Sequence, residues 1–328
     1  MKKFINLQLF AENTNLTTSP GLSEEMKKYY SDYLIDNAQP KLVHDQFGQK
    51  HPIPKNGGKT IQFRKYSPLP KLTTPLQEGV TPNGQSLTMS VIEATVAQFG
   101  GYVTLSDVLL LTAIDNNLVQ ATKLLGAQAG ATLDTITREV LNGGTNVVFS
   151  GGKSARADLG AADTLSVDDI KKSVRFLKNQ NAEQINGSWV AIIHPDVSYD
   201  LTNDPLWKDV KTYDPDDLYE GEIGKIFGVR FVETTEAKKF TKVKNDPNVG
   251  AYTIYSTLVL GDNAYGVTEI TGGGLEHIVK QLGSAGTADP LNQRATAGWK
   301  ATKVAERLVE NYMVRIESCS TFNDVNAN

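Results

Sequence analysis

Two short stretches of this chain alternate cleanly between apolar and polar residues, Thr60-Ile61-Gln62-Phe63-Arg64 and Leu87-Thr88-Met89-Ser90-Val91. Such alternation predicts two β-strands, each with one covered face. Between them lie four prolines and two glycines, which resist regular packing. Because a two-stranded hairpin is marginal in water on its own, the segment from Gly48 to Gly101 is predicted to be a long arm that binds another molecule. This pattern indicates an assembly protein.

A proline-free stretch from Thr104 to Gly143 follows the arm and predicts one long helix. Thr104 with Asp107 three residues later fits a capping pattern, and apolar residues then recur every three or four positions from Leu118 to Val140. A helix of roughly 36 residues would be roughly 54 Å long. Such a length is typical of a strut rather than of a recognition helix.

The remaining sequence predicts a terminal helix and a mixed α/β unit. A polar tail, residues 1–20, precedes a short helix that opens at Ser23 and ends or kinks at Pro40. The α/β unit is predicted from a helix at Thr164–Ala182 capped by Ser166 and Asp169, strands at 189–193, 229–233 and 252–260, and a helix at 195–202. Further alternation at 275–280 and 299–318 predicts strands that pair beside the long helix, so that both ends of the chain would build the first domain.

The amino-acid composition excludes several classes of protein. The 328 residues are 40% hydrophobic and 21% charged, with a net charge of −4, which is ordinary for a folded soluble chain. A net negative charge argues against a protein whose main function is to bind the phosphate backbone of nucleic acids. The single cysteine, Cys319, excludes an internal disulfide and a cysteine-based zinc site and suits a reducing cytoplasm. No stretch approaches the roughly 20 apolar residues of a membrane span, so no membrane association is expected.

The sequence contains no complete motif for catalysis or for cofactor binding. In the segment 144–154, Val147 stands where a phosphate-binding loop needs glycine, so a flexible loop is predicted instead. In the segment 214–218, Leu218 replaces a calcium ligand, so a solvated acidic loop is predicted. The four histidines, His44, His51, His194 and His277, have no partners at ligand spacing and are expected on the surface or in turns. We therefore expect no enzyme, no catalytic residue, no cofactor and no metal site.

Several phrases of the chain, taken in order, resemble the major capsid proteins of tailed bacteriophages, specifically the N-four-like family. They span roughly residues 21 to 318 and are Ala38-Gln39-Pro40-Lys41-Leu42-Val43, Ile53-Pro54-Lys55-Asn56-Gly57-Gly58-Lys59-Thr60, Thr74-Pro75-Leu76-Gln77-Glu78-Gly79-Val80-Thr81-Pro82, Phe99-Gly100-Gly101-Tyr102, Ile193-His194-Pro195-Asp196-Val197, Gly221-Glu222-Ile223-Gly224-Lys225-Ile226-Phe227-Gly228-Val229-Arg230-Phe231, Asp289-Pro290-Leu291-Asn292-Gln293-Arg294 and Gly298-Trp299-Lys300. A match of this extent is more specific than any single motif.

The resemblance implies an α+β chain with the Hong-Kong-97-type capsid fold. Its parts would be an N-terminal arm at 1–47, an extended β-hairpin loop at 48–101, a peripheral domain with a long spine helix at 102–163, an axial α/β domain at 164–261, and the rest of the peripheral domain at 262–328. The arm, the loop and the spine coincide with segments already predicted from the residues alone.

The function implied is that of a structural subunit that self-assembles into hexamers and pentamers of an icosahedral head around double-stranded DNA. It would be assembled in the host cytoplasm and reside in the virion, with scaffolding, portal and decoration proteins as candidate partners. Predicted intersubunit contacts are Ile61, Phe63, Leu87 and Met89, which would face a neighbour's spine helix or peripheral sheet. On this interpretation Phe63→Asp leaves a soluble monomer that does not close shells.

Two charged segments carry further expectations. The slightly basic tail 1–20 is expected to be a disordered tail without a role, and the alternative is contact with packaged DNA without sequence preference. Seven acids between Asp204 and Glu222 would repeat around the axis of each capsomer, so that divalent cations would stabilise the shell and a chelator would lower its melting temperature.

Two alternatives to the capsid function stay open. One is an encapsulin-like nanocompartment shell, which shares the fold, and the other is a soluble enzyme, which would need a set of catalytic residues.

Overall fold

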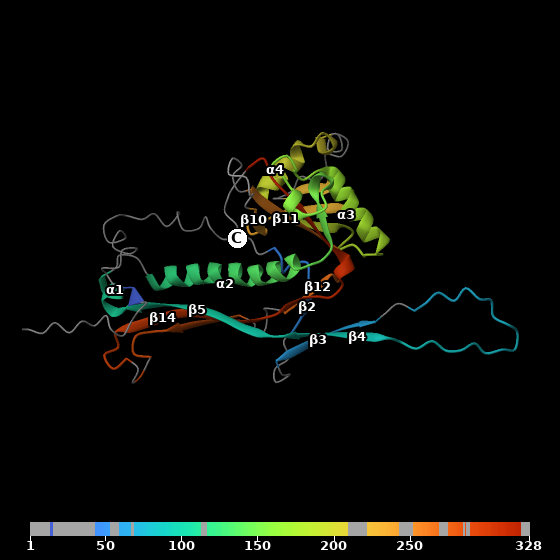
Figure 1. The fold of residues 1–328 in the computed structure, drawn as a ribbon. Coiled ribbons are helices and arrows are strands. Elements are labelled where there is room, and N and C mark those ends of the chain that lie inside the picture. The colour runs from blue at the N-terminus through green and yellow to red at the C-terminus, as the bar shows by residue number, and fades with distance from the viewer. Residues whose placement is uncertain are drawn as a thin grey trace, which may run out of the picture.

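The computed structural model describes residues 14–15, 43–52, 59–66, 69–112, 117–208, 222–242, 252–268, 275–284, 286 and 289–322. Figure 1 shows a block of sheet and short helices, a long helix lying on an elongated sheet, and a hairpin that projects from the junction of the two. The described part of the chain is therefore an α+β fold with two bodies and one arm.

The elongated body is a four-stranded sheet covered by one helix. The sheet has the order β1-β5-β14-β13, with bounds Thr14–Asn15, Ala97–Ser106, Arg294–Lys303 and Leu275–Lys280. Helix α2, Asn117–Asn142, lies along it and spans about 39 Å at the usual rise per residue. Both halves of the sequence contribute, because β5 pairs antiparallel with β14 over its whole length.

The apolar stripe of α2 makes the core of this body. Leu125, Ala129 and Leu133 are buried against Ala297, Trp299 and Ala301 of β14. The indole of Trp299 also donates a hydrogen bond from Nε1 to Oε1 of Gln128, at 3.2 Å. Burying the stripe accounts for the helical period of the sequence here.

The helix begins later than the sequence predicts, which corrects the expected start at Thr104. Residues 104–106 complete β5 by pairing with residues 294–296 of β14. A short helix, α1, then runs from Asp107 to Thr112, and Ser106 caps it by accepting a hydrogen bond at Oγ from the backbone N–H of Leu109. The capping signal in the sequence was real, but it belongs to Ser106 and to a separate helix.

The second body is a seven-stranded mixed sheet with the order β6-β16-β11-β7-β9-β8, and with β10 paired beside β11. The strand bounds are Val147–Phe149, Met313–Ser318, Tyr252–Leu260, Trp189–Ile193, Val229–Glu233, Glu222–Ile226 and Lys239–Lys242. Helices α3, Val167–Asn179, and α4, Pro195–Asn203, pack on one face of the sheet. The other face packs on Leu141 of α2 and on Tyr265. Strand β7 is buried on both faces, which explains its unbroken apolar sequence.

The predicted cap of the second helix is confirmed. The side chain of Ser166 accepts a hydrogen bond from the backbone N–H of Asp169, and Asp169 returns the contact to the Ser166 backbone. The carboxylate of Asp204, at the end of α4, also accepts a hydrogen bond from the backbone N–H of Val167, at 3.0 Å. The first amides of α3 are thus satisfied by two side chains.

The C-terminal strands divide between the two bodies, which corrects the expectation that all of them lie beside the long helix. Strands β13 and β14 do so, but β16 pairs antiparallel with β11 and parallel with β6 in the seven-stranded sheet. Almost every residue of β16 is buried, so it is an interior strand. Strand β6 lies in the segment 144–154, which is therefore an ordered sheet edge rather than the flexible loop predicted.

Smaller elements connect the two bodies. A three-stranded sheet joins β15, Ala305–Arg307, β12, Tyr265–Thr268, and β2, Gln49–His51. The projecting hairpin consists of β3, Thr60–Tyr66, and β4, Met89–Thr95. Short 3-10 helices lie at Ser150–Gly152, Arg156–Asp158 and Glu310–Tyr312.

A buried polar cluster fixes the chain just before β2. The backbone N–H of His44 donates to Oδ1 of Asp134, and its Nδ1 lies 2.7 Å from Oδ2 of the same carboxylate. Asp45 accepts a hydrogen bond from Thr137 and pairs with the fully buried ammonium of Lys303 on β14. Residues 44 and 45 are thus attached to α2 and to the elongated sheet at once.

Removing the Asp45 carboxylate tests this attachment. Asp45→Ala leaves the Lys303 ammonium buried without a partner, and we expect it to lower the free energy of unfolding by about 3–5 kcal/mol. The double variant Asp45→Ala, Lys303→Met should recover most of that loss, since it removes the uncompensated charge. Urea unfolding of unassembled subunits measures both.

The matched control is the exposed pair of Lys300 and Glu276, whose charged atoms are 3.2 Å apart. Glu276→Ala should change the free energy of unfolding by less than about 1 kcal/mol, because solvent screens this pair. An equally small effect of Asp45→Ala would show that the buried pair does not hold the chain.

Candidate intersubunit surfaces

The register of the hairpin gives it two distinct faces. Phe63 pairs with Ile92 and Ile61 with Ala94, so these four side chains share one face, called here the inner face. Val91 and Met89 lie on the opposite, outer face, where Val91 pairs with Arg64. The alternation seen in the sequence therefore separates residues that pack within the chain from residues that do not.

The inner face packs on the body of the same chain. Phe63 is only 3% exposed, and its ring meets the His51 ring edge-on with the centroids 4.8 Å apart. Its ring also lies over Gly266 of β12, where a Cβ atom would come within 2.5 Å of Cε1 of Phe63. Glycine at 266 is thus what lets the hairpin seat against the three-stranded sheet.

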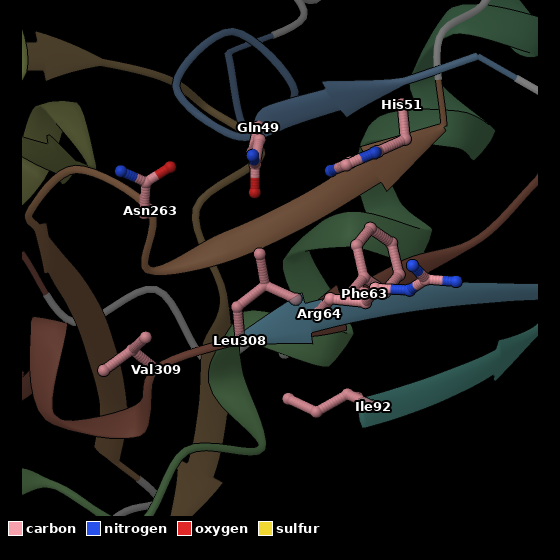
Figure 2. A pocket seen from close by; sticks show the side chains of 8 residues that line it. All are labelled: Gln49, His51, Phe63, Arg64, Ile92, Asn263, Leu308 and Val309. Atoms are coloured by element: carbon pink, nitrogen blue, oxygen red, sulfur yellow. The ribbon is translucent and has the colours of Figure 1, made fainter. Parts of the chain in front are cut away.

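A cavity of about 210 Å³ lies beside this contact. Figure 2 shows Phe63 and Ile92 reaching it from the hairpin, His51 from β2 and Leu308 and Val309 from the segment after β15. Nε2 of His51 is buried and has no hydrogen-bond partner in the described part of the chain. The cavity is small and is lined by both polar and apolar residues. It lies where the base of the hairpin packs on the rest of the chain.

The outer face and the loop beyond it lie in solvent. Val91 and Met89 are exposed, Met89 by 45%, and Leu87 before the strand is exposed by 72%. Residues 69–88 have no regular secondary structure and are exposed throughout, including Leu72 and Leu76. Apolar side chains presented along one arm are typical of a surface that another molecule covers.

The structure separates the four predicted contact residues. Leu87 and Met89 are exposed as that prediction requires, Ile61 is half-buried, and Phe63 is buried within its own chain. The intersubunit role of Ile61, Leu87 and Met89 stays a prediction. For Phe63 the expectation changes: its substitution acts first on how the hairpin is seated, because its ring is already covered by His51 and Gly266.

Further exposed apolar side chains lie on the elongated body, at Tyr102, Val108, Leu111, Leu124 and Leu291. They come from β5, α1, α2 and the segment before β14. The run Leu109-Leu110-Leu111 was the available signal, because a six-residue helix cannot bury three successive leucines on one face.

Ion pairs join the two bodies near the end of α2. The buried Arg138 donates a hydrogen bond to the carbonyl of Glu236, at 2.9 Å. Burial alone would raise the pKa of Glu139, but hydrogen bonds from Lys238 and Arg138 outweigh it and hold that pKa below its usual value. Arg138, Glu139, Glu236 and Lys238 therefore connect α2 to the turn before β10.

A second network lies on β16. Glu317 is fully buried and accepts two hydrogen bonds from Arg156, at 2.5 and 2.6 Å. These bonds raise the pKa of Arg156, whereas burial lowers the pKa of the neighbouring Arg315.

Burial also raises the pKa of the Tyr265 hydroxyl on β12, which donates a hydrogen bond to the carbonyl of His44. All these groups hold elements together.

Two of the histidines are corrected by the structure. His44 lies in a turn, one of the two predicted settings, but it is buried against Asp134 rather than on the surface. His194 is also buried, between the end of β7 and the N-terminus of α4, where it accepts a hydrogen bond from the backbone N–H of Asp196. Cys319 is buried and has no disulfide. The described residues include no group of three or more His, Cys, Asp or Glu able to hold a metal.

Residues 209–221 of the acidic stretch lie outside the described residues. The solvated loop expected at 214–218 and the effect expected of divalent cations therefore stay predictions. The expected absence of enzymatic activity also stays a prediction.

The family of the chain follows from its sequence match. The sequence model of the family described as phage capsid protein matches residues 112–281, which is more than half of the chain. The chain belongs to the phage capsid protein family. It is a major capsid protein of tailed phages, a structural component of the virion capsid. The match does not favour the encapsulin alternative. Among curated proteins, no sequence matches this capsid protein.

Solved structures show the same fold. The capsid of Ralstonia phage GP4 aligns with a TM-score of 0.69 at 14% identity, covering 96% of this chain and 100% of that one. The capsid of the cyanophage P-SCSP1u aligns with a TM-score of 0.63 at 14% identity, over 98% and 100%. The acid-stable capsid of Helicobacter pylori bacteriophage KHP30 aligns with a TM-score of 0.60 at 12% identity, over 97% and 100%. None of the helices in the described part of this capsid protein has the length and hydropathy of a membrane span.

Truncating Phe63 tests the seating of the hairpin. Phe63→Ala removes the ring between His51 and Gly266, and we expect it to lower the free energy of unfolding of the subunit by about 3–5 kcal/mol. Leu87→Ala, on the exposed arm, should change it by less than about 0.5 kcal/mol. Urea unfolding of unassembled subunits compares them, and equal effects would contradict the division of the hairpin into a packed and an open part.

Proposed function

We propose that this capsid protein builds an icosahedral phage head as hexamers and pentamers, using the Hong-Kong-97-type arrangement of arm, extended loop, spine helix and axial domain. The observation that carries the proposal is the projecting hairpin, whose base is packed on its own chain while its outer face and its tip, residues 69–91, are exposed. A lone subunit leaves this apolar surface in water, and a neighbour would cover it.

The elements map onto that arrangement with adjusted boundaries. We assign residues 1–47 to the arm and 48–101 to the extended loop, with β5 beginning at Ala97. The spine is α2, and the peripheral domain would comprise 102–143 with β13 and β14. The axial domain would be the seven-stranded sheet, which extends the predicted 164–261 by β6 and β16. The parallel pairing of β1 with β5 supports an arm that crosses the peripheral domain.

The contact between subunits would use the open part of the hairpin. We assign Leu87 and Met89, together with Val91, to contact with a neighbour's spine helix or peripheral sheet, and Ile61 to the edge of that contact. Phe63 would act indirectly, by holding the hairpin at the angle that reaches the neighbour. The packed base gives the arm a fixed direction, so less ordering is needed on assembly.

The remaining partners are proposed from the same assignment. Packaged double-stranded DNA would fill the shell, and scaffolding, portal and decoration proteins would join it. The tail 1–20 lies outside the described residues, so its contact with DNA stays a prediction. Assembly would take place in the host cytoplasm.

Expression of the chain alone, followed by electron microscopy, tests the proposed assembly. We expect closed icosahedral shells, or flat hexamer sheets and tubes. The double variant Leu87→Asp, Met89→Asp should abolish them while leaving the melting temperature of the free subunit unchanged, because both side chains are exposed there.

The control places one acid at another exposed apolar position of the same chain, Tyr199→Asp on α4. Normal shells from the Leu87 and Met89 double variant would overturn the assigned contact. A chain that stays monomeric even when phage scaffolding protein is added would overturn the assembly itself.

A further inference from the structure

An open groove of about 410 Å³ lies on the seven-stranded body, away from the hairpin. One wall is the outer side of α3, and the other is the turn between β8 and β9. The groove is lined by Lys171, Val174, Arg175, Lys178, Asn179 and Phe227. Three of these six residues are cationic and none is acidic, so the groove is suited to an anionic occupant.

The cations of the groove form no ion pairs within the described part of the chain, although the pKa of the nearby Asp168 is lowered by its hydrogen bond with Lys172 and also by the charge of Lys171. Nζ of Lys171 lies 4.7 Å from the ring centroid of Phe227, and Nζ of Lys178 lies 5.6 Å from that of Trp189. No carboxylate among the described residues forms an ion pair with Lys171, Arg175 or Lys178. Asp168, the exposed acid on the same helix, is paired with Lys172 at 2.9 Å.

The aromatic wall is held in a costly conformation. Ile226 pairs directly with Val229, so Phe227 and Gly228 form a two-residue turn, with φ angles of 51° and 81°. Turns with two positive φ angles favour asparagine followed by glycine, and phenylalanine is unfavourable at the first position. Phe227 is nevertheless 43% exposed over the groove. A strained, exposed aromatic is typical of a position used for contact.

The chain itself carries a segment of complementary charge. The stretch 204–222 contains seven acids and two lysines. Its described ends lie away from the groove: Asp204 caps the first residue of α3, and Glu222 opens β8, the strand that reaches Phe227 only at its other end. The two described residues that flank the stretch therefore lie at the ends of α3 and β8 opposite to Asn179 and Phe227.

We propose that the groove binds the acidic stretch, residues 209–221, of a second copy of this chain. The inference rests on the proposed assembly, in which identical bodies meet around an axis through unlike surfaces. A basic groove and an acidic stretch on one body make such contacts attractive and fix which surfaces meet. Packaged DNA is the other candidate anion, but three cations on two turns of one helix make a short patch on a chain of net charge −4.

Cross-linking of assembled particles tests the occupant. Particles are formed from an equal mixture of isotopically light and heavy subunits and treated with a carbodiimide, which joins lysine to carboxylate. We expect peptides that link Lys171 or Lys178 to Asp214, Asp216 or Asp217, and that combine one light and one heavy partner. Links formed only within light or only within heavy chains would place a subunit's own stretch in the groove and overturn the proposal.

DNA is distinguished by acetylation of the same lysines. Under the proposal Lys171 and Lys178 are protected equally in empty shells and in filled heads. Protection that occurs only in filled heads would assign the groove to DNA. Intact particles without protection or links would overturn the groove contact and leave the proposed assembly standing.

Charge exchange gives an independent test. Lys171→Glu, Arg175→Glu and Lys178→Glu together should lower the yield of closed shells by roughly tenfold, as should Asp214→Lys, Asp216→Lys and Asp217→Lys. Combining the two sets should restore the yield, and Lys123→Glu, on the exposed side of α2, should leave it unchanged. No rescue in the combined variant, with subunits still folded, would overturn the pairing.

One substitution in the turn should keep the stability of the free subunit and weaken the proposed contact between subunits. Phe227→Asn relieves the turn, so the free subunit should melt no lower than the parent. It should also weaken the interchain cross-links, because the aromatic wall beside Lys171 is lost. Unchanged cross-linking would show that Phe227 takes no part in the contact.

Discussion

The C-terminal half of α2 is the constraint on which the rest of the fold depends. Its apolar side chains belong to two cores, Leu133 to that of the elongated body and Leu141 to that between the bodies. Polar residues at the same end are buried as well, and each reaches a different element. Asp134 holds His44, Thr137 holds Asp45, and Arg138 holds the carbonyl of Glu236. Buried polar groups tolerate few alternative arrangements, so they set the relative position of the parts.

The polar contacts of α2 also decide where the hairpin points. Residues 44 and 45 lead directly into β2, which pairs with β12, and Gly266 of β12 seats Phe63. A chain of short contacts thus runs from the helix to the arm. The result is a subunit with a packed interior and an open apolar surface along the hairpin. Such a division suits a protein whose surfaces are completed by copies of itself.

Local sequence signals predicted the elements whose patterns are complete within a few residues. Strands β7, β11 and β13 begin and end where alternation or a buried run predicts, and α3 begins at its Ser166 and Asp169 box. Alternation gave each hairpin strand two faces, but which residues of the two strands share a face could not be predicted, because a connection of some twenty exposed residues imposes no register of the kind a tight turn imposes. The roles of His44 and of β16 depended on partners about 60 to 90 residues away, which periodicity does not detect. Of the proposed contact surface, the hairpin was visible as alternation, whereas the seating of Phe63 against Gly266 exists only in the folded chain.

The pair formed by Asp45 and Lys303 also determines when a subunit can be finished. These residues are separated by 258 positions, and they are held together in one buried site. At the usual speed of synthesis, roughly 13 to 50 s pass between their emergence from the ribosome. During that interval β14 is absent, so β5 has no antiparallel neighbour and the stripe of α2 has nothing to cover it. A chain that ends before β14 therefore cannot form the four-stranded sheet or cover the stripe of α2, so an incomplete copy cannot take the place of a finished subunit.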